Sequence, residues 1–279
     1  MQALCDCPAP AKINLFLHVV GRRPDGYHLL QSAFRMLDWG DRLDFHCRDD
    51  GQIRRVNDVA GVPEDADLVV RAARALQAAA GTPMGVDITV RKVLPMGGGL
   101  GGGSSDAATT LLALNRLWNL GLTRTALQDL ALPLGADVPF FVFGRSAFVE
   151  GVGERLAPLT LAPHWYVIVH PGVHVPTVEI FRAKELTRNT KLLKIADFAD
   201  HATGNDLEPV ACQRYPQIAA AIEWLGQYAP ARMTGSGACI FSAFDTAQAA
   251  QDVARQCPQG WRAWAVPSLE AHPLHDWAG

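Results

Sequence analysis

A glycine-rich segment that ends in two serines carries the residue types and spacing best suited to chemistry in this sequence. It reads Pro95, Met96, Gly97, Gly98, Gly99, Leu100, Gly101, Gly102, Gly103, Ser104, Ser105 and Asp106. Because glycine has no Cβ, the backbone can adopt left-handed conformations and place its amides against a ligand as an anion-binding nest. The alanine- and leucine-rich stretch that follows predicts a helix, whose free N–H groups attract anions and which Ser104 and Ser105 would cap. A polyphosphate is the simplest ligand for such a site.

Three other interpretations of the glycine segment fit the sequence less well. A flexible linker is seldom followed at once by a strong helix. The spacing of a dinucleotide loop is present, but residues 86–91 alternate in polarity like a half-exposed antiparallel strand, and no acidic residue follows about 20 positions later. The sequence has no Gly-Lys pair and no His-Arg-Asp or Asp-Phe-Gly signature, which excludes a Walker A loop and a protein kinase. A phosphate-binding loop of another kind remains.

Three further features could contribute to the same chemistry. Lys12 is a lone cation on an apolar strand, Asp137 is an isolated carboxylate in the apolar segment 135–141, and Gly235-Ser236-Gly237 forms a second glycine turn. Each has an ordinary structural explanation: a surface lysine with a packed stem, a turn cap and a tight turn. Together with a phosphate loop they form a coherent kinase site. Asp137 would accept or orient the proton of an attacking alcohol, and Lys12 would keep that carboxylate ionised and stabilise developing charge.

The elements that must position these residues are strands and helices that do not alternate strictly along the sequence. This order predicts an α+β fold. In the first half we expect strands 11–19, 31–37, 41–47 and 86–93, with a turn at 38–40. We also expect a helix at 67–80 that Gly81 ends, a helix from the glycine segment to 118 that Gly121 ends, and a further helix after Thr123. In the second half we expect strands 165–169 and 261–266, a turn and strand over 233–241, and helices 178–186, 217–228 and 247–256. The pattern restarts near residue 160, so we expect two domains, 1–158 and 159–279.

Composition narrows the class of protein. The chain has 279 residues and a net charge of -3 without a long charged block, which disfavours broad binding to nucleic acid or a membrane surface. No apolar stretch reaches the roughly 20 residues that span a bilayer, and the N-terminus does not resemble a secretory signal. The six cysteines are scattered, as reduced thiols are. We therefore expect a cytoplasmic protein that acts on a small molecule as a monomer or weak homodimer.

At these residues the sequence resembles the GHMP kinase superfamily, which includes galactokinase, homoserine kinase and mevalonate kinases. Besides the glycine segment, the matching segments are residues 10–17, 23–28, 134–141, 170–173, 205–208 and 234–238. They follow the order of the superfamily over almost the whole chain. Asp-Gly-Tyr-His at 25–28 and Gly-Ala-Asp-Val-Pro at 135–139 are the most specific, and they resemble the members that phosphorylate a cytidine diphosphate-linked methylerythritol.

The resemblance implies a ribosomal-S5-like N-terminal domain, a ferredoxin-like C-terminal domain and substrates in the cleft between them. ATP would transfer its γ-phosphoryl group to the 2-hydroxyl of the methylerythritol, in the non-mevalonate route to isoprenoids. Lys12 and Asp137 match the catalytic pair. The other matched positions are Lys92 and residues 97–105 for ATP, Asn14 for the methylerythritol, Tyr27 and Phe181 around the cytosine, and His28 at its edge. Thr177 would line the pocket, and Gly235 to Gly237 would shape the phosphate region from the second domain.

Two positions depart from the pattern, since relatives often carry Asn where this chain has Asp67 and Asp106. Both remain candidate nucleotide contacts, although a carboxylate at Asp106 would repel ATP unless Mg²⁺ or water intervenes. Mg²⁺ is expected as the counter-ion of phosphoryl transfer, held mainly by ATP and water with Ser105 as a candidate ligand. Two alternatives stay open: another kinase of the superfamily, acting on mevalonate, homoserine or a sugar, and a nucleotide-binding regulator without catalysis.

Overall fold

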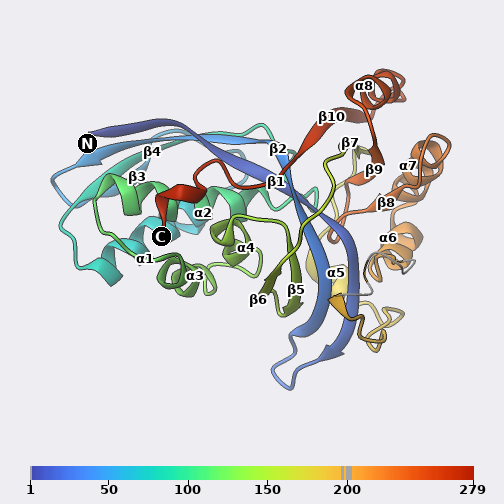
Figure 1. Ribbon diagram of the computed structural model, residues 1–279, viewed down its shortest axis with the longest axis horizontal. Coiled ribbons are helices and arrows are strands. Elements are labelled where there is room, and N and C mark those ends of the chain that lie inside the picture. Colours follow the sequence, from blue (N-terminus) through green and yellow to red (C-terminus); the bar gives the residue numbers. More distant parts are fainter. Residues whose placement is uncertain (1, 196–197, 199–202) are drawn as a thin grey trace.

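The fold is built around one long antiparallel hairpin that runs through most of the molecule. This computed structural model describes residues 2–195, 198 and 203–279. The hairpin consists of β1 (Ala3–Arg22) and β2 (His28–Arg48), drawn in blue in Figure 1. The other strands are β3 (Ile53–Arg55), β4 (Gly85–Arg91), β5 (Ala147–Gly151), β6 (Arg155–Pro158), β7 (Trp165–His170), β8 (Arg232–Met233), β9 (Ile240–Phe244) and β10 (Arg262–Leu269). The helices are η1 (Glu64–Ala66), α1 (Leu68–Ala80), α2 (Gly102–Leu117), α3 (Arg124–Ala131), α4 (Val138–Phe143), α5 (Thr177–Arg182), α6 (Glu208–Arg214), α7 (Pro216–Gly226), α8 (Ala247–Arg255) and η3 (His275–Trp277).

The strands form one mixed sheet in which β2 connects the two halves of the chain. The order is β3-β4-β2-β10-β7-β9-β8, with β1 and β5 also paired to β2, and β6 paired to β5. The β1–β2 pair is antiparallel, and β4 is antiparallel to β2, as its alternating sequence predicts. Because β1 extends alongside both halves, residues on it can reach groups from each of them.

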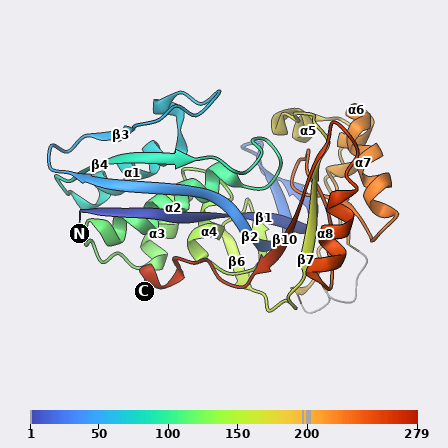
Figure 2. The same ribbon diagram turned by 90° about the horizontal axis from the view of Figure 1, so that it is seen from above.

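Two main hydrophobic cores lie on this sheet. Helices α1 to α4 contribute apolar side chains to the first core, against β1, β2 and β4, and helices α5 to α8 contribute to the second core, against β7 and β9. Figures 1 and 2 show the two helix groups at opposite ends of the molecule, with the hairpin running between them. Apolar burial of this extent is the main favourable term in folding. The strand and helix content confirms the predicted α+β class.

The C-terminus returns to the first core. Leu274 and Ala278 are buried there, and the guanidinium of Arg124 donates to the carbonyl of Ala278 at 2.7 Å. The last ten residues thus pack with the N-terminal half, and the division at residue 158 stays a prediction. No helix among the described residues is long and apolar enough to cross a bilayer.

Several predicted boundaries are confirmed by their caps. Asp67 accepts a hydrogen bond from the Val69 amide at the start of α1, and Gly81 ends that helix in the left-handed conformation. Thr123 caps α3 by accepting a hydrogen bond from the Ala126 amide. The predicted strands at 165–169 and 261–266 and the helices at 217–228 and 247–256 correspond to β7, β10, α7 and α8 within a few residues.

Other boundary predictions were wrong. Residues 38–40 are not a turn, because β2 continues through them with a shift of register against β1 between Pro10 and Ala11. The cap of α2 is Gly101, with no side-chain hydrogen bond, instead of Ser104 or Ser105. At the other end of α2 the cap is Trp118, ahead of Gly121. The helix predicted at 178–186 ends at Arg182, and α6 was not predicted.

Candidate active site

Lys12 and Asp137, 125 positions apart in the sequence, form an ion pair. The Lys12 side chain extends from β1 and is almost fully buried, and its Nζ lies 3.3 Å from Oδ2 of Asp137. The same ammonium donates to Oδ1 of Asn14 at 2.6 Å and lies 4.8 Å from the centre of the Phe34 ring. A buried cation is costly unless it is paired, and here a carboxylate, an amide and an aromatic face stabilise it.

The Asp137 carboxylate is not used to cap a helix, although Asp137 stands at a helix start. It occupies the N-cap position of α4, yet its side chain makes no capping hydrogen bond. Its side chain is 31% exposed, whereas that of Lys12 is 4% exposed. The pair therefore presents the carboxylate to the open side and keeps the ammonium behind it.

The glycine segment adopts the conformations that its composition predicts. The φ angles of Gly97, Gly99 and Gly101 are +68°, +75° and +73°, which side chains with a Cβ rarely adopt. A Cβ on Gly99 would stand 2.3 Å from the backbone oxygen of Thr234, in the second half of the chain. The loop therefore packs tightly enough against residues 234–239 that only glycine fits at position 99.

Backbone contacts fix the loop beside the ion pair. The Lys12 amide donates to the carbonyl of Leu100 at 2.9 Å, and the Cys239 amide donates to the carbonyl of Gly98 at 3.1 Å. Helix α2 begins directly after this segment, with its first N–H groups free of any side-chain cap. Unpaired helix N–H groups and a nest of amides together form an anion site.

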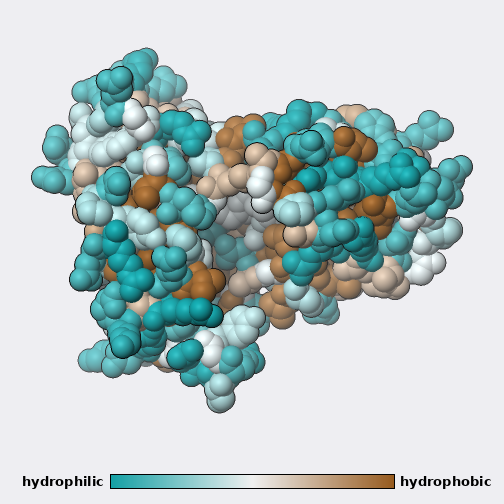
Figure 3. Space-filling model, turned by 180° about the vertical axis from the view of Figure 1, so that it is seen from behind, coloured by the Kyte–Doolittle hydropathy of each residue, from teal (hydrophilic) through white to brown (hydrophobic). Residues whose placement is uncertain are grey.

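Two cavities meet at the glycine segment. The large cavity has a volume of about 810 Å³ and contains Lys12 and Asp137 in its wall. The small cavity has a volume of about 370 Å³ and lies along the segment itself. Four residues line both cavities: Gly97, Gly99, Gly101 and Ser104. Figure 3 shows the surface hollowed between the two parts of the molecule. A group held in one cavity thus lies next to a group held in the other.

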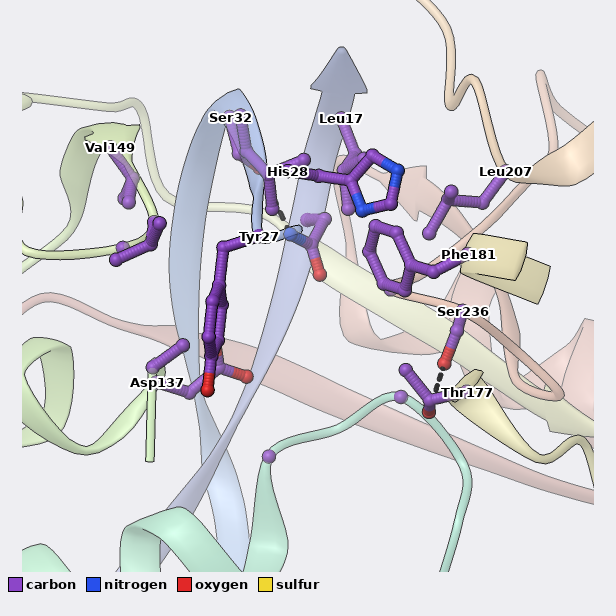
Figure 4. Close-up of a pocket in the computed structure, with 18 of the residues that line it drawn as sticks. Leu17, Tyr27, His28, Ser32, Asp137, Val149, Thr177, Phe181, Leu207 and Ser236 are labelled. Atoms are coloured by element: carbon purple, nitrogen blue, oxygen red, sulfur yellow. Dashed lines mark hydrogen bonds between the residues drawn. The ribbon is translucent and has the colours of Figure 1, made fainter. Parts of the chain in front are cut away.

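All the predicted acceptor residues line the large cavity. They are Asn14, Tyr27, His28, Thr177, Phe181 and Gly235. Figure 4 shows Tyr27 on one side of the cavity, and Phe181 with His28 on the other. Tyr27 is 66% exposed, so the face of its aromatic ring is available for stacking on a ligand. The rings of His28 and Phe181 lie 5.0 Å apart between centroids.

Hydrogen bonds from the second half of the chain position the polar part of this wall. The backbone amide of Asn14 donates to Oγ1 of Thr234 at 2.9 Å, and the side-chain oxygens of Thr177 and Ser236 are 2.7 Å apart. The Asn205 side chain donates to the carbonyl of Gly235 at 2.8 Å. These bonds hold the turn at 234–237 against β1, so both halves of the chain build the cavity.

The predicted nucleotide residues line the small cavity with one exception. Lys92, Asp67, Asp106 and the residues from Pro95 to Ser104 all contribute to its wall. The exception is Ser105, which is fully buried and lines neither cavity. Both carboxylate oxygens of Asp67 are engaged by protein, one by the Val69 amide and the other by the Arg55 guanidinium.

Lys92 lies between two carboxylates at the base of the small cavity. Its Nζ is 2.7 Å from Oδ2 of Asp106 and also pairs with Asp41. Burial raises the pKa of Asp106 to about 7, although Lys92 acts in the opposite direction. Asp41 is fully buried and also accepts from the backbone amides of Val93 and Leu94, at 2.6 Å and 2.9 Å. It thereby fixes the backbone that leads into the glycine segment.

The sequence analysis missed several residues that support the site. Asp41 had no signal, because it stands between Gly40 and Arg42 in a segment with other acids and its partners are about 50 positions away. Thr234 was included only as part of a glycine turn. Arg188 contacts His28 from behind and had no signal, because a single arginine in a polar segment is typical of an exposed surface.

Comparison with known proteins agrees with this geometry. A model of the GHMP kinases N terminal domain matches residues 67–145, and a model of the GHMP kinases C terminal domain matches residues 183–263. Two similar proteins are named 4-diphosphocytidyl-2-C-methyl-D-erythritol kinase. The one from Azoarcus sp. (strain BH72) is 66% identical over 98% of this chain and 96% of that relative. The one from Aromatoleum aromaticum is 63% identical over 100% of this chain and 98% of that relative.

A solved structure gives the same result. The crystal structure of a 4-(cytidine 5'-diphospho)-2C-methyl-D-erythritol kinase superposes with a TM-score of 0.79 at 34% identity, covering 95% of this chain and 98% of that one. The sequence resemblance is thus confirmed, and the chain belongs to the GHMP kinase family.

Proposed function

We propose that this chain transfers the γ-phosphoryl group of ATP to the 2-hydroxyl of 4-diphosphocytidyl-2-C-methyl-D-erythritol, in the non-mevalonate route to isoprenoids. One observation carries the proposal: the Lys12–Asp137 pair lies in the wall of the large cavity, which shares the glycine segment with the small one. The names of the relatives at 63% and 66% identity support this acceptor.

The small cavity accounts for the donor. Triphosphate oxygens placed along residues 97–101 would meet backbone amides and the start of α2. Such fixed dipoles stabilise charge as it develops on the transferring group, without reorganisation. The shared lining residues would then hold the terminal phosphate at the opening to the large cavity.

The ion pair accounts for the acceptor chemistry. With its Oδ2 held 3.3 Å from Nζ of Lys12, the Asp137 carboxylate can accept or orient the proton of a hydroxyl in the large cavity. Lys12 is kept in place by Asn14 and supplies a positive charge beside the reacting oxygens. Alignment of the hydroxyl with the phosphate is the main contribution that such a site makes to the rate.

The rest of the large cavity accounts for the choice of acceptor. Tyr27 and Phe181 would enclose the cytosine ring, and the hydrogen-bonding groups of His28 would meet its edge. Asn14, Thr177 and Gly235 line the same cavity and would contact the methylerythritol and diphosphate. A mevalonate, homoserine or sugar has no base to stack, so the aromatic end would add little for those acceptors.

Mg²⁺ fits this site as an ion carried by the nucleotide. Within the described ranges no cluster of three His, Cys, Asp or Glu side chains is arranged to hold a metal. The Ser104 hydroxyl lines both cavities and would supply an oxygen ligand, whereas Ser105, the candidate from the sequence, is fully buried and lines neither cavity. Bound there, the ion would neutralise charge on the phosphates.

A coupled ADP-release assay tests the proposal. The enzyme is supplied with ATP and Mg²⁺ and, in separate reactions, with 4-diphosphocytidyl-2-C-methyl-D-erythritol, mevalonate, homoserine and galactose. We expect turnover with the cytidyl acceptor alone. Turnover with one of the other acceptors would assign the chain to another activity of the superfamily, and ATP binding without any turnover would favour a regulatory protein.

A further inference from the structure

Arg188 contacts His28, whose imidazole lines the large cavity and can act either as a donor or as an acceptor toward a base. We propose that Arg188 fixes His28 as the tautomer that donates from Nδ1, and thereby makes the cavity select a pyrimidine with an unprotonated N3. Arg188 is a positioning residue in this proposal, which rests on the proposed function.

The contacts of Arg188 leave its guanidinium little freedom. Its terminal nitrogens donate to the carbonyls of Phe181 at 3.0 Å, Ala183 at 2.6 Å and Leu186 at 3.0 Å. The remaining nitrogen, Nε, donates to Nε2 of His28 at 3.1 Å. Because three backbone carbonyls fix the plane of the guanidinium, the direction of the Nε–H bond is fixed as well.

The chemistry of arginine then determines the state of the imidazole. A guanidinium has only donors and stays protonated, so the atom it meets must be an acceptor. Nε2 of His28 therefore carries a lone pair, and the proton of the neutral ring is on Nδ1. Burial, with the charges of Arg188 and Arg22, also lowers the pKa of His28, which favours the neutral ring.

The free ring nitrogen belongs to the wall of the large cavity. Within the described part of the chain, Nδ1 of His28 has no protein hydrogen-bond partner. His28 lines the cavity beside Phe181, whose own carbonyl is one of the three that hold Arg188 (Figure 4). A single side chain thus positions both the ring proposed to stack on the base and the ring proposed to read its edge.

A donor at Nδ1 distinguishes between two pyrimidines. N3 of cytosine is an acceptor and can receive the Nδ1–H bond. N3 of uracil carries a hydrogen, so two donors would face each other and one polar group would lose its partner on burial. A lost partner of this kind costs roughly 5- to 150-fold in binding.

The test compares kcat/KM for the cytidyl acceptor with kcat/KM for its uridyl analogue. We expect the intact protein to prefer the cytidyl acceptor and Arg188→Met to reduce that preference by about 10-fold, because the freed imidazole can then protonate Nε2 and accept at Nδ1. Arg214→Met is the matched control. Arg214 also holds this region, donating to the Glu179 carbonyl of α5 at 3.2 Å, but its hydrogen bonds do not include His28.

A direct measurement covers the case in which Arg188→Met does not fold. Imidazole ¹⁵N spectra of the intact protein should show that Nδ1 of His28 is protonated and Nε2 is not. The His28 signals are identified as those missing from the spectrum of His28→Asn. A bare Nδ1, or an unchanged cytidyl-to-uridyl preference in a folded Arg188→Met, would overturn the inference. An equal loss for both acceptors would reduce Arg188 to a structural role and also overturn it. Absence of turnover by the intact protein with the cytidyl acceptor would instead reject the proposed function.

Discussion

Replacing Asp106 with asparagine should stabilise the protein, and the gain should grow as the pH rises. Asp106 is 4% exposed, its Oδ2 pairs with Lys92, and its Oδ1 is buried with no partner among the described residues. Asp41 competes for the same ammonium. Burial therefore raises the pKa of Asp106 from 3.8 to about 7. Asparagine has nearly the same shape and can still accept from Lys92, but it cannot ionise.

The sign of the effect follows from proton binding. The pKa of Asp106 is higher in the folded protein than in the unfolded chain, so between these two values the folded state binds more protons. The free energy of unfolding contributed by this group is therefore greatest below pH 4 and falls as the pH rises to about 7. At 1.36 kcal/mol per pH unit, the interval from 3.8 to about 7 gives an upper bound of about 4 kcal/mol.

Urea unfolding of the intact protein and Asp106→Asn at pH 5, 6, 7 and 8 measures this effect. The difference in free energy of unfolding should increase with pH and level off above pH 7. Asp50→Asn is the control, because its ion pair with Arg48 lowers the pKa of Asp50 to about 2, outside this range. A difference for Asp106→Asn that stays constant, or that shrinks with rising pH, would refute the reasoning.

Two further substitutions test the walls of the cavities. Tyr27→Ala should raise KM for the cytidyl acceptor about 10-fold with little change in KM for ATP, because base stacking contributes about 1–3 kcal/mol, and an unchanged acceptor KM would reject the assignment. Gly99→Ala should weaken ATP binding more than about 10-fold, since the new Cβ would stand 2.3 Å from the Thr234 carbonyl at a φ of +75°. Calorimetric titration with ATP measures the second effect, with Gly226→Ala, where nothing lies within 4 Å, as the control. Unaltered ATP affinity in Gly99→Ala would contradict the proposed place of the triphosphate.

The residues that the fold brings together around the cavities could be recognised because their types are unusual where they stand. A run of glycines before a helix has few other uses, and a lysine and an aspartate in apolar segments stand out against their neighbours. The boundaries of α1 were predicted for a similar reason, because its N-cap Asp67 and its left-handed Gly81 act over only a few residues.

Features that depend on distant partners could not be predicted. Gly40 resembles a turn residue, yet a Cβ there would stand 2.1 Å from the carbonyl of Ala9, so the glycine serves the close approach of β1 to β2. The partners of Asp41, and His28 as a partner of Arg188, are brought close only by the folded chain, and no local pattern marks them. Likewise α2 begins at Gly102, so Ser105 lies inside the helix with its side chain buried, which the order of residues after the glycines does not reveal.

The most direct test of the central claim is the turnover of Asp137→Asn beside its affinity for ATP. The variant keeps the shape of the side chain and removes the charge that faces Lys12 at 3.3 Å. If Asp137 handles the proton of the acceptor hydroxyl, kcat in the coupled ADP-release assay should fall by about 10²- to 10⁴-fold while the Kd for ATP stays within about twofold. Near-normal turnover of Asp137→Asn with the cytidyl acceptor would contradict the account.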